Sequence, residues 1–213
     1  MKIQHIAFLV VMSWFLTTSI ACGGPAKNTK QKTTTVKKQI PEPNVGNANE
    51  IVKKYALRKN EKRANLWKVF VKKNDSQGKE KANLVLVRIE IDLNFDGKID
   101  IKRFYKKNVK THEMFDLDYD GKIDLITYYS QGYPFKKAYF LHSKTKPDVF
   151  KYFEVEGKKG KKHIRLIRKE RDTNLDGKID YWEYWENGSL DRIGRDTDFN
   201  GKVDVWEKSS NNN

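Results

Sequence analysis

Four nearly identical acidic segments recur along this chain, and they constrain its fold more than any other feature. Each reads Asp-x-[Asn/Asp]-x-[Asp/Asn]-Gly-Lys-[Ile/Val]-Asp, and the four begin at Asp92, Asp116, Asp172 and Asp196. The starting points are 24, 56 and 24 residues apart, which indicates a 24-residue period with one disguised unit in the gap. The region is therefore expected to be an array of a single supersecondary unit.

The disguised unit is predicted to begin at Phe140. Aligning it there places residues 146–150 opposite 178–182, and the positions that carry Asp or Asn in the other units become Phe140, His142 and Lys144. We therefore expect this unit to have kept its strand residues and lost its carboxylates. A further degenerate unit is expected in front of the array, at residues 64–70.

The spacing of the oxygen-bearing side chains predicts calcium sites. Side chains at positions 1, 3, 5 and 9, a carbonyl at position 7, a glycine at position 6 and a bidentate carboxylate at position 12 can surround a hard cation. We number the segments loop 1 (residues 92–103), loop 2 (116–127), loop 3 (172–183) and loop 4 (196–207). The predicted ligands, each lysine through its carbonyl, are Asp92, Asn94, Asp96, Lys98 and Asp100 in loop 1; Asp116, Asp118, Asp120, Lys122 and Asp124 in loop 2; Asp172, Asn174, Asp176, Lys178, Asp180 and Glu183 in loop 3; and Asp196, Asp198, Asn200, Lys202, Asp204 and Glu207 in loop 4.

The four loops are expected to differ in affinity. Only loops 3 and 4 match the complete motif, because Glu183 and Glu207 stand at position 12. That position is Thr127 in loop 2 and Arg103 in loop 1, and the arginine cation would oppose binding. Magnesium fits less well than calcium, because it demands near-octahedral geometry and loses water reluctantly. The alternative is that Asp, Asn and Gly only make turns, but carboxylates this close repel one another unless a cation neutralises them.

The segments between the loops predict strands and turns. Aromatic and β-branched residues follow each loop, as in residues 181–185 and 125–129, and they favour strands. Asn187-Gly188 and Gln131-Gly132 then indicate hairpin turns. The expected fold is all-β, with repeated antiparallel hairpins in a meander or open sheet joined by EF-hand-like calcium loops. A helical EF-hand arrangement and a short amphipathic helix at residues 50–58 are the alternatives.

The N-terminal segment predicts export and lipidation. An apolar run of about 11 residues, too short to span a bilayer, precedes Ser-Ile-Ala-Cys at residues 19–22, which resembles the lipobox of bacterial lipoproteins. We expect a signal peptide at residues 1–21, acylation of Cys22, a flexible basic linker over 22–50 and the calcium-loop β-repeat domain over 51–213. The only cysteine is then consumed, so no disulfide forms.

A family resemblance rests on the repeated loops. From about Asn65 to Glu207 the chain resembles Gram-negative bacterial lipoproteins with EF-hand-like loops of the form Asp-Thr-Asn-x-Asp-Gly-Lys-Ile-Asp-x-Trp-Glu-Tyr, which residues 172–184 match closely. The resemblance implies calcium and a location in the cell envelope. Together with the lipobox, the predicted location is the outer membrane, lipid-anchored and facing the periplasm or the surface. The loops are also similar to those of dockerins and thrombospondin type 3 repeats, although the segment that follows departs from the dockerin helix.

The remaining motifs favour binding over catalysis. His112, His142 and His163 lack the neighbours of a zinc site, and neither a P-loop nor a dinucleotide fingerprint occurs, so no catalytic residue is predicted. The prediction is a calcium-binding cell-envelope protein with a structural or scaffold role. A calcium-dependent adhesin and a cell-wall-modifying enzyme are the alternatives.

The charge of the chain indicates what it associates with. Lys and Arg number 43 against 28 Asp and Glu, giving a net charge of +15, which favours anionic surfaces. The predicted partners are calcium, a membrane through the N-terminal lipid, and an anionic envelope polymer or a protein. A basic cluster at residues 158–169 is a candidate contact, and an envelope location argues against nucleic acid.

Overall fold

All regular secondary structure in the described part of the chain is β-strand. The computed structural model describes residues 42–73, 83–157 and 162–209. The predicted signal peptide, Cys22 and the linker up to residue 41 lie outside these residues, as do residues 158–161 of the basic cluster. The all-β prediction is confirmed, and both helical alternatives are wrong, because residues 50–55 and the segments after the loops are strands. Within these ranges there is no helix long and apolar enough to cross a membrane.

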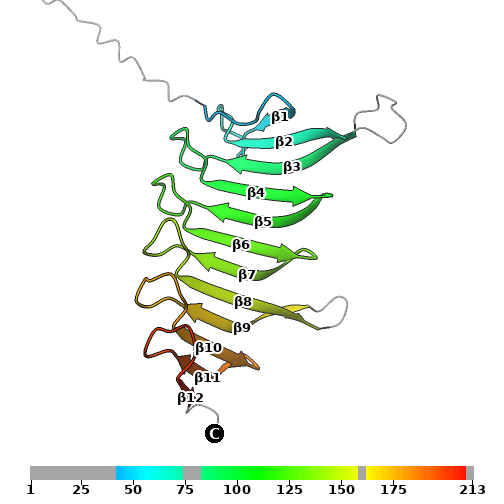
Figure 1. Cartoon of the computed structure of the whole chain (residues 1–213). Helices are drawn as coiled ribbons and strands as arrows, with labels where there is room; N and C mark the ends of the chain where they lie inside the picture. Colours follow the sequence, from blue (N-terminus) through cyan, green and yellow to red (C-terminus); the bar gives the residue numbers. More distant parts are fainter. Residues whose placement is uncertain (1–41, 74–82, 158–161, 210–213) are drawn as a thin grey trace, which may run out of the picture. The chain divides into compact units, whose positions relative to one another are not determined.

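In the described residues, twelve strands form one antiparallel sheet in which each strand pairs only with its neighbours in sequence (Figure 1). This is the predicted meander, continued through every repeat. The strands are β1 (Glu50–Tyr55), β2 (Leu66–Lys73), β3 (Asn83–Ile91), β4 (Ile101–Lys106), β5 (Val109–Phe115), β6 (Leu125–Ser130), β7 (Tyr133–Tyr139), β8 (Val149–Glu156), β9 (His163–Arg171), β10 (Tyr181–Glu186), β11 (Ser189–Arg195) and β12 (Val205–Lys208).

The connections between strands alternate between two sides of the sheet, one at each end of the strands, as Figure 1 shows. At one end of the strands, two-residue turns close the hairpins β4–β5, β6–β7 and β10–β11. Both turn residues have positive φ, for example 50° at Gln131 and 85° at Gly132. This conformation is that of a type I′ turn, whose twist matches the twist of antiparallel strands.

At the other end of the strands, five nine-residue connections recur, at residues 92–100, 116–124, 140–148, 172–180 and 196–204. The third of these is the disguised unit, which we call the hidden loop (residues 140–151). Its hairpin, β8–β9, has strands of 8 and 9 residues, whereas β10 and β11 have 6 and 7. The longer hairpin accounts for the broken period in the sequence.

The sheet is a single layer, because no helix or second sheet among the described residues covers either face. Among the described residues its buried apolar side chains are few, namely Trp67, Val69, Ile91, Ala138 and Val149. Cross-strand pairs of long side chains therefore carry much of the packing.

One cross-strand row shows this packing clearly. It alternates ring and basic side chains across eight strands in the order Phe104, His112, Tyr128, Lys136, Tyr152, Arg168, Tyr184 and Arg192. The Phe104 and His112 rings stack at 4.3 Å, and the Arg168 guanidinium lies 4.2 Å from the centre of the Tyr152 ring. These contacts are cation–π and stacking pairs, which stabilise a sheet that has no second layer.

Candidate metal-binding loops

Consecutive loops are joined by backbone hydrogen bonds. The N–H at position 1 of each loop donates to the carbonyl at position 9 of the loop before it. The Asp116 N–H donates to Asp100 at 2.8 Å, that of Asp172 to Asp148 at 2.9 Å, and that of Asp196 to Asp180 at 2.9 Å. The loops therefore form a stack that runs across the sheet at one end of its strands, and the stacking fixes where each loop begins.

The carboxylate at position 9 closes its own loop. Asp100 accepts the N–H of Leu93 at 2.6 Å, and it is buried. In the hidden loop, buried Asp148 does the same, accepting the N–H groups of Leu141 at 3.1 Å and His142 at 2.7 Å. The expectation that this unit has lost its carboxylates is wrong at this position, because the turn itself requires the acceptor.

The degenerate unit in front of the array uses the same acceptor position. Asn65 directly precedes β2 and is buried, and its side-chain oxygen accepts the N–H of Leu57 at 2.8 Å. An amide oxygen therefore replaces the carboxylate there. The position is kept for loop closure, with or without a charge.

In loops 1, 2 and 3 the carboxylate at position 1 has one oxygen that accepts a hydrogen bond and one that does not. The N–H of the glycine at position 6 donates to Oδ2 of the position 1 Asp, for example from Gly121 to Asp116 at 2.7 Å. Gly121 has a φ of 91°, which side chains rarely tolerate. The other oxygen, Oδ1, is shielded from solvent without a hydrogen-bond partner in the described residues in three loops, at Asp92, Asp116 and Asp172. These residues are 0%, 3% and 8% exposed.

Positions 3 and 5 make side-chain turns with the backbone. In loop 2, Asp118 accepts the N–H of Asp120 at 3.2 Å, and Asp120 accepts the N–H of Lys122 at 2.7 Å. Loops 1, 3 and 4 repeat the pattern, with the N–H of Lys98, Lys178 and Lys202 donating at 2.8, 2.8 and 2.9 Å. Each turn engages one oxygen of the side chain. In loops 1, 3 and 4 the second oxygen of Asp96, Asp176 and Asp198 also accepts a hydrogen bond, from the amide of Asn94, Asn174 and Asn200, so the turns account for most of the oxygens at these positions.

Two loops gather three carboxylates closely enough to hold a metal ion. In loop 2 these are Asp116, Asp118 and Asp120, and in loop 4 they are Asp196, Asp198 and Asp204. Within each group the ligand oxygens lie within 4.8 Å of one another. Carboxylate oxygens are the donors that hard divalent cations prefer.

Three of the residues predicted at position 12 form ion pairs with side chains of neighbouring strands. Glu183 is in β10 and pairs with Lys169 at 2.9 Å, and Glu207 is in β12 and pairs with Arg195 at 3.2 Å. Arg103, in β4, pairs with Glu113 at 2.7 Å. Because a strand rises about 3.3 Å per residue, position 12 is carried about 10 Å beyond position 9, whereas a helix would turn it back over the loop. The strand that follows the loop therefore directs this side chain to cross-strand neighbours.

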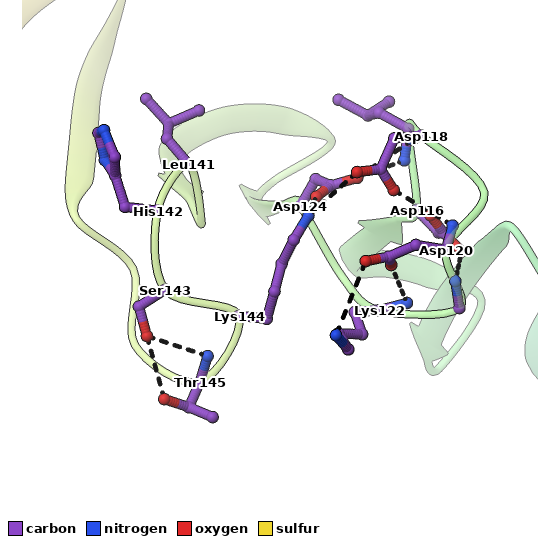
Figure 2. Close-up of polar contacts among 12 residues, drawn as sticks. Asp116, Asp118, Asp120, Lys122, Asp124, Leu141, His142, Ser143, Lys144 and Thr145 are labelled. Carbon is purple, nitrogen blue, oxygen red and sulfur yellow. Dashed lines mark hydrogen bonds and ion pairs between the residues drawn. The ribbon is translucent and has the colours of Figure 1, made fainter.

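One contact between two loops was not anticipated from the sequence. Lys144, at position 5 of the hidden loop, extends to loop 2 (Figure 2). Its Nζ donates to Oδ1 of Asp124 and lies 3.3 Å from Oδ2 of Asp118. The signal in the sequence was a cation at a position where the other four loops carry Asp or Asn.

The contact with Lys144 changes the electrostatics of loop 2. Burial would raise the pKa of Asp124, but the hydrogen bonds from Lys144 and from the Leu117 N–H hold that pKa below its usual range. The equivalent residue of loop 1 behaves in the opposite way. Burial raises the pKa of Asp100, and the neighbouring charges of Asp92 and Asp96 act in the same direction. The position 9 carboxyl therefore has a lowered pKa in loop 2, where Lys144 contacts it, and a raised pKa in loop 1.

Comparisons with known proteins add little to this geometry. No protein-family model matches the chain, and no curated protein matches it. One solved structure with partial similarity is a crystal structure of a GtfA/B complex, at 16% identity and a TM-score of 0.39. The match covers 52% of this chain and 19% of that one, so the chain spans about a fifth of its length. A TM-score this low supports no conclusion about function.

Proposed function

We propose that this protein is a lipid-anchored, calcium-binding repeat module that acts as a scaffold in the cell envelope. Its loops hold divalent cations, and the cations stiffen the stack of loops. The proposal assigns no catalytic residue.

The observation that carries the proposal is the set of buried carboxylate oxygens that have no partner among the described residues. Oδ1 of Asp92, Asp116 and Asp172 occupies the same position in three loops. Leaving a charged acceptor unsatisfied in the interior costs about 1–3 kcal/mol or more. A repeated cost of this kind at one position is explained if the oxygen is a ligand.

Calcium suits this donor set better than magnesium. It accepts 6–8 oxygen ligands in flexible geometry, at about 2.3–2.6 Å. The loops offer carboxylate, amide and backbone oxygens from a turn that is already closed by hydrogen bonds. Without Glu183 or Glu207 in the cage, water completes the shell, and a weak affinity of about 10⁻⁴ to 10⁻³ M, as in extracellular modules, is expected.

A cation in each loop would also act on the neighbouring loops. Position 1 and position 9 of consecutive loops share a backbone hydrogen bond, so fixing position 1 fixes the start of the next loop. Neutralising the carboxylates removes the repulsion between them along the stack of loops. The scaffold role follows from this stiffening.

Calorimetric titration and thermal unfolding of the full chain test the proposal together. Calcium should bind with at least two sites and raise the Tm, and EGTA should reverse the rise. Magnesium at the same concentration is the control and should produce a smaller rise. A melting curve that is identical in millimolar calcium and in EGTA would refute the proposal.

The lipid anchor is tested separately. The proposal rests on the sequence at residues 19–22, and it predicts that Cys22 carries a fatty acid in the bacterial envelope. Metabolic labelling with palmitate should mark the wild-type protein and not Cys22→Ser. Equal labelling of both proteins would show that Cys22 is not the anchor.

A second candidate function is the binding of an anionic envelope polymer, and one row of lysines favours it. Lys137, Lys151 and Lys169 lie directly opposite one another on the adjacent strands β7, β8 and β9. Like charges in this register destabilise a sheet. Lys169 pairs with Glu183, but Lys137 and Lys151 pair with no carboxylate of the described residues and lie 5.7 and 5.2 Å from the centres of aromatic rings.

The lysine row is a better candidate than the described part of the predicted basic cluster. In that cluster Arg165 pairs with Glu156 at 2.5 Å, and Arg168 pairs with Glu170 at 3.0 Å. The probe is fluorescent polyglutamate in a salt titration, with the double variant Lys137→Gln/Lys151→Gln and the loop variant Lys122→Gln as control. Only the double variant should weaken binding and reduce its salt dependence. Equal binding by all three proteins would exclude the row as the contact.

A further inference from the structure

Lys144 supplies a cation to loop 2 from the neighbouring loop. The two oxygens that it contacts, Oδ1 of Asp124 and Oδ2 of Asp118, belong to positions 9 and 3 of loop 2. In loop 1 the oxygen equivalent to Asp124 Oδ1 is Oδ1 of Asp100, which is shielded from solvent and has no hydrogen-bond partner in the described chain. The equivalent oxygen therefore has no hydrogen-bond partner in loop 1, at Asp100, and accepts a hydrogen bond from an ammonium group in loop 2, at Asp124.

The charge of loop 2 explains why an added cation is tolerated there. Within its nine-residue turn, loop 2 carries carboxylates at all four of positions 1, 3, 5 and 9, whereas loops 1, 3 and 4 carry three each and an amide at the remaining position. The ammonium of Lys144 brings the net charge of the site to that of the other three. Its side chain is only 25% exposed, and its ammonium contacts both Asp118 and Asp124.

Loop 2 nevertheless keeps the features of a metal site. Asp116, Asp118 and Asp120 bring their oxygens within 4.8 Å of one another. Asp116 is 3% exposed, and its Oδ1 has no partner in the part of the chain that the structure describes. The Lys144 ammonium contacts Asp118, which is a member of this group, and does not satisfy Asp116.

We propose that loop 2 holds either the Lys144 ammonium or a divalent cation, so that calcium binding there must displace Lys144. The inference rests on the proposed function, because it requires that these loops bind calcium. Two consequences follow. Loop 2 binds calcium more weakly than its four carboxylates alone would allow, and filling it releases the contact between loop 2 and the hidden loop.

Each loop contains its own reporter for the test. The N–H groups of Gly97, Gly121, Gly177 and Gly201 donate to the position 1 carboxylates of loops 1, 2, 3 and 4. In the full chain labelled with ¹⁵N-glycine, the four amide resonances can be followed separately as calcium is added. The Gly121 resonance then reports loop 2 most directly, because this N–H donates to Asp116, and the Gly97 resonance shows any contribution from loop 1.

The decisive variant is Lys144→Gln, and Lys146→Gln is the matched control. Lys146 carries the same charge in the same hidden loop, but it lies against Gly177 of loop 3, so its loss leaves loop 2 untouched. Lys144→Arg keeps the cation and guards against an effect of misfolding. We expect Lys144→Gln to lower the calcium concentration at the midpoint of the Gly121 shift by about tenfold or more, because one positive charge leaves the site. Lys146→Gln and Lys144→Arg should stay within about threefold of the wild type.

The possible results separate the two ideas. If Gly177 and Gly201 respond to calcium and the Gly121 midpoint is the same in the wild type and in Lys144→Gln, the inference about Lys144 is overturned and the proposed function stands. An equal shift of the Gly121 midpoint in Lys146→Gln also overturns it, because the effect would then be one of general charge. If none of the four glycine amides responds in either protein, the proposed function fails and the inference fails with it.

Discussion

The backbone N–H of Asp116 donates to the backbone carbonyl of Asp100 at 2.8 Å, which joins position 1 of loop 2 to position 9 of loop 1. The side chains of the same two residues each have one oxygen that is buried and unsatisfied within the described structure. The two residues whose backbones join the loops thus also carry the candidate ligand oxygens. Cation binding and loop stacking are expected to be coupled for this reason.

Removing the charge of Asp116 should have opposite effects with and without calcium. In EGTA, Asp116→Asn should raise the free energy of unfolding by about 1 kcal/mol, because an unsatisfied buried carboxylate disappears and the introduced amide can donate to Asp118 or Asp120. In calcium at 100 times the Kd, the variant should lose up to about 2.7 kcal/mol of stabilisation from that site. Urea unfolding in both buffers measures the change. Asp191→Asn, outside the loops, is the control, and the same sign in both buffers would contradict the prediction.

Glu183 should matter for stability and not for calcium affinity. Its ion pair with Lys169 is mostly buried, so Glu183→Gln should lower the free energy of unfolding by about 1.5–3 kcal/mol with calcium or without it. The pair of Glu207 with Arg195 is about half exposed, so Glu207→Gln should cost less than about 1 kcal/mol. Chemical denaturation and calcium titration of both variants check this. A large loss of affinity at loop 3 in Glu183→Gln would show instead that this residue is a ligand.

Asp148 should make the hidden loop sensitive to acid. Burial would raise the pKa of Asp148, but the N–H groups of His142 and Leu141 hold that pKa below its usual range. A carboxyl whose folded pKa is lowered stabilises the protein above its unfolded pKa of about 3.9, and the contribution is lost as the pH falls through the folded value. Asp148→Asn should therefore cost about 1–2 kcal/mol at pH 7, and the difference from wild type should shrink below pH 4. Urea unfolding at a series of pH values in EGTA measures this, and a gap that is independent of pH would be the contrary result.

The turn at Gln131 and Gly132 should respond only to backbone conformation. A Cβ at Gly132 would meet nothing within 4 Å, but its φ of 85° strains any side chain. Gly132→Ala should lower the free energy of unfolding by about 1–2 kcal/mol. Gln131→Asn should raise it by a few tenths of a kcal/mol, since Asn adopts the left-handed conformation more readily. Thermal unfolding in EGTA distinguishes the two signs, and two variants that shift the Tm in the same direction would contradict this explanation.

Most of the architecture was readable from the sequence. The repeated acidic segments, the aromatic runs after them and the Gly-containing turns each have a local physical cause, so they predicted the hairpins, the loops and even the unit disguised at Phe140. The same local rules placed Asp, Asn and Gly at the positions that close each turn. Loop closure depends on residues no more than eight apart, and such contacts are encoded in spacing.

The tertiary structure decided what faces what. The motif placed Glu183 in the cage of loop 3, but the strand that follows the loop carries this side chain to Lys169 on the neighbouring strand β9. The tertiary structure also brings Lys144 to Asp118 and Asp124, which are 26 and 20 residues away in sequence. The sequence alone determined that oxygen-rich turns recur, because each turn is made by its own residues. Which charges compensate those turns was decided only when the sheet stacked one loop on the next, because that depends on strand register and on the direction of each strand.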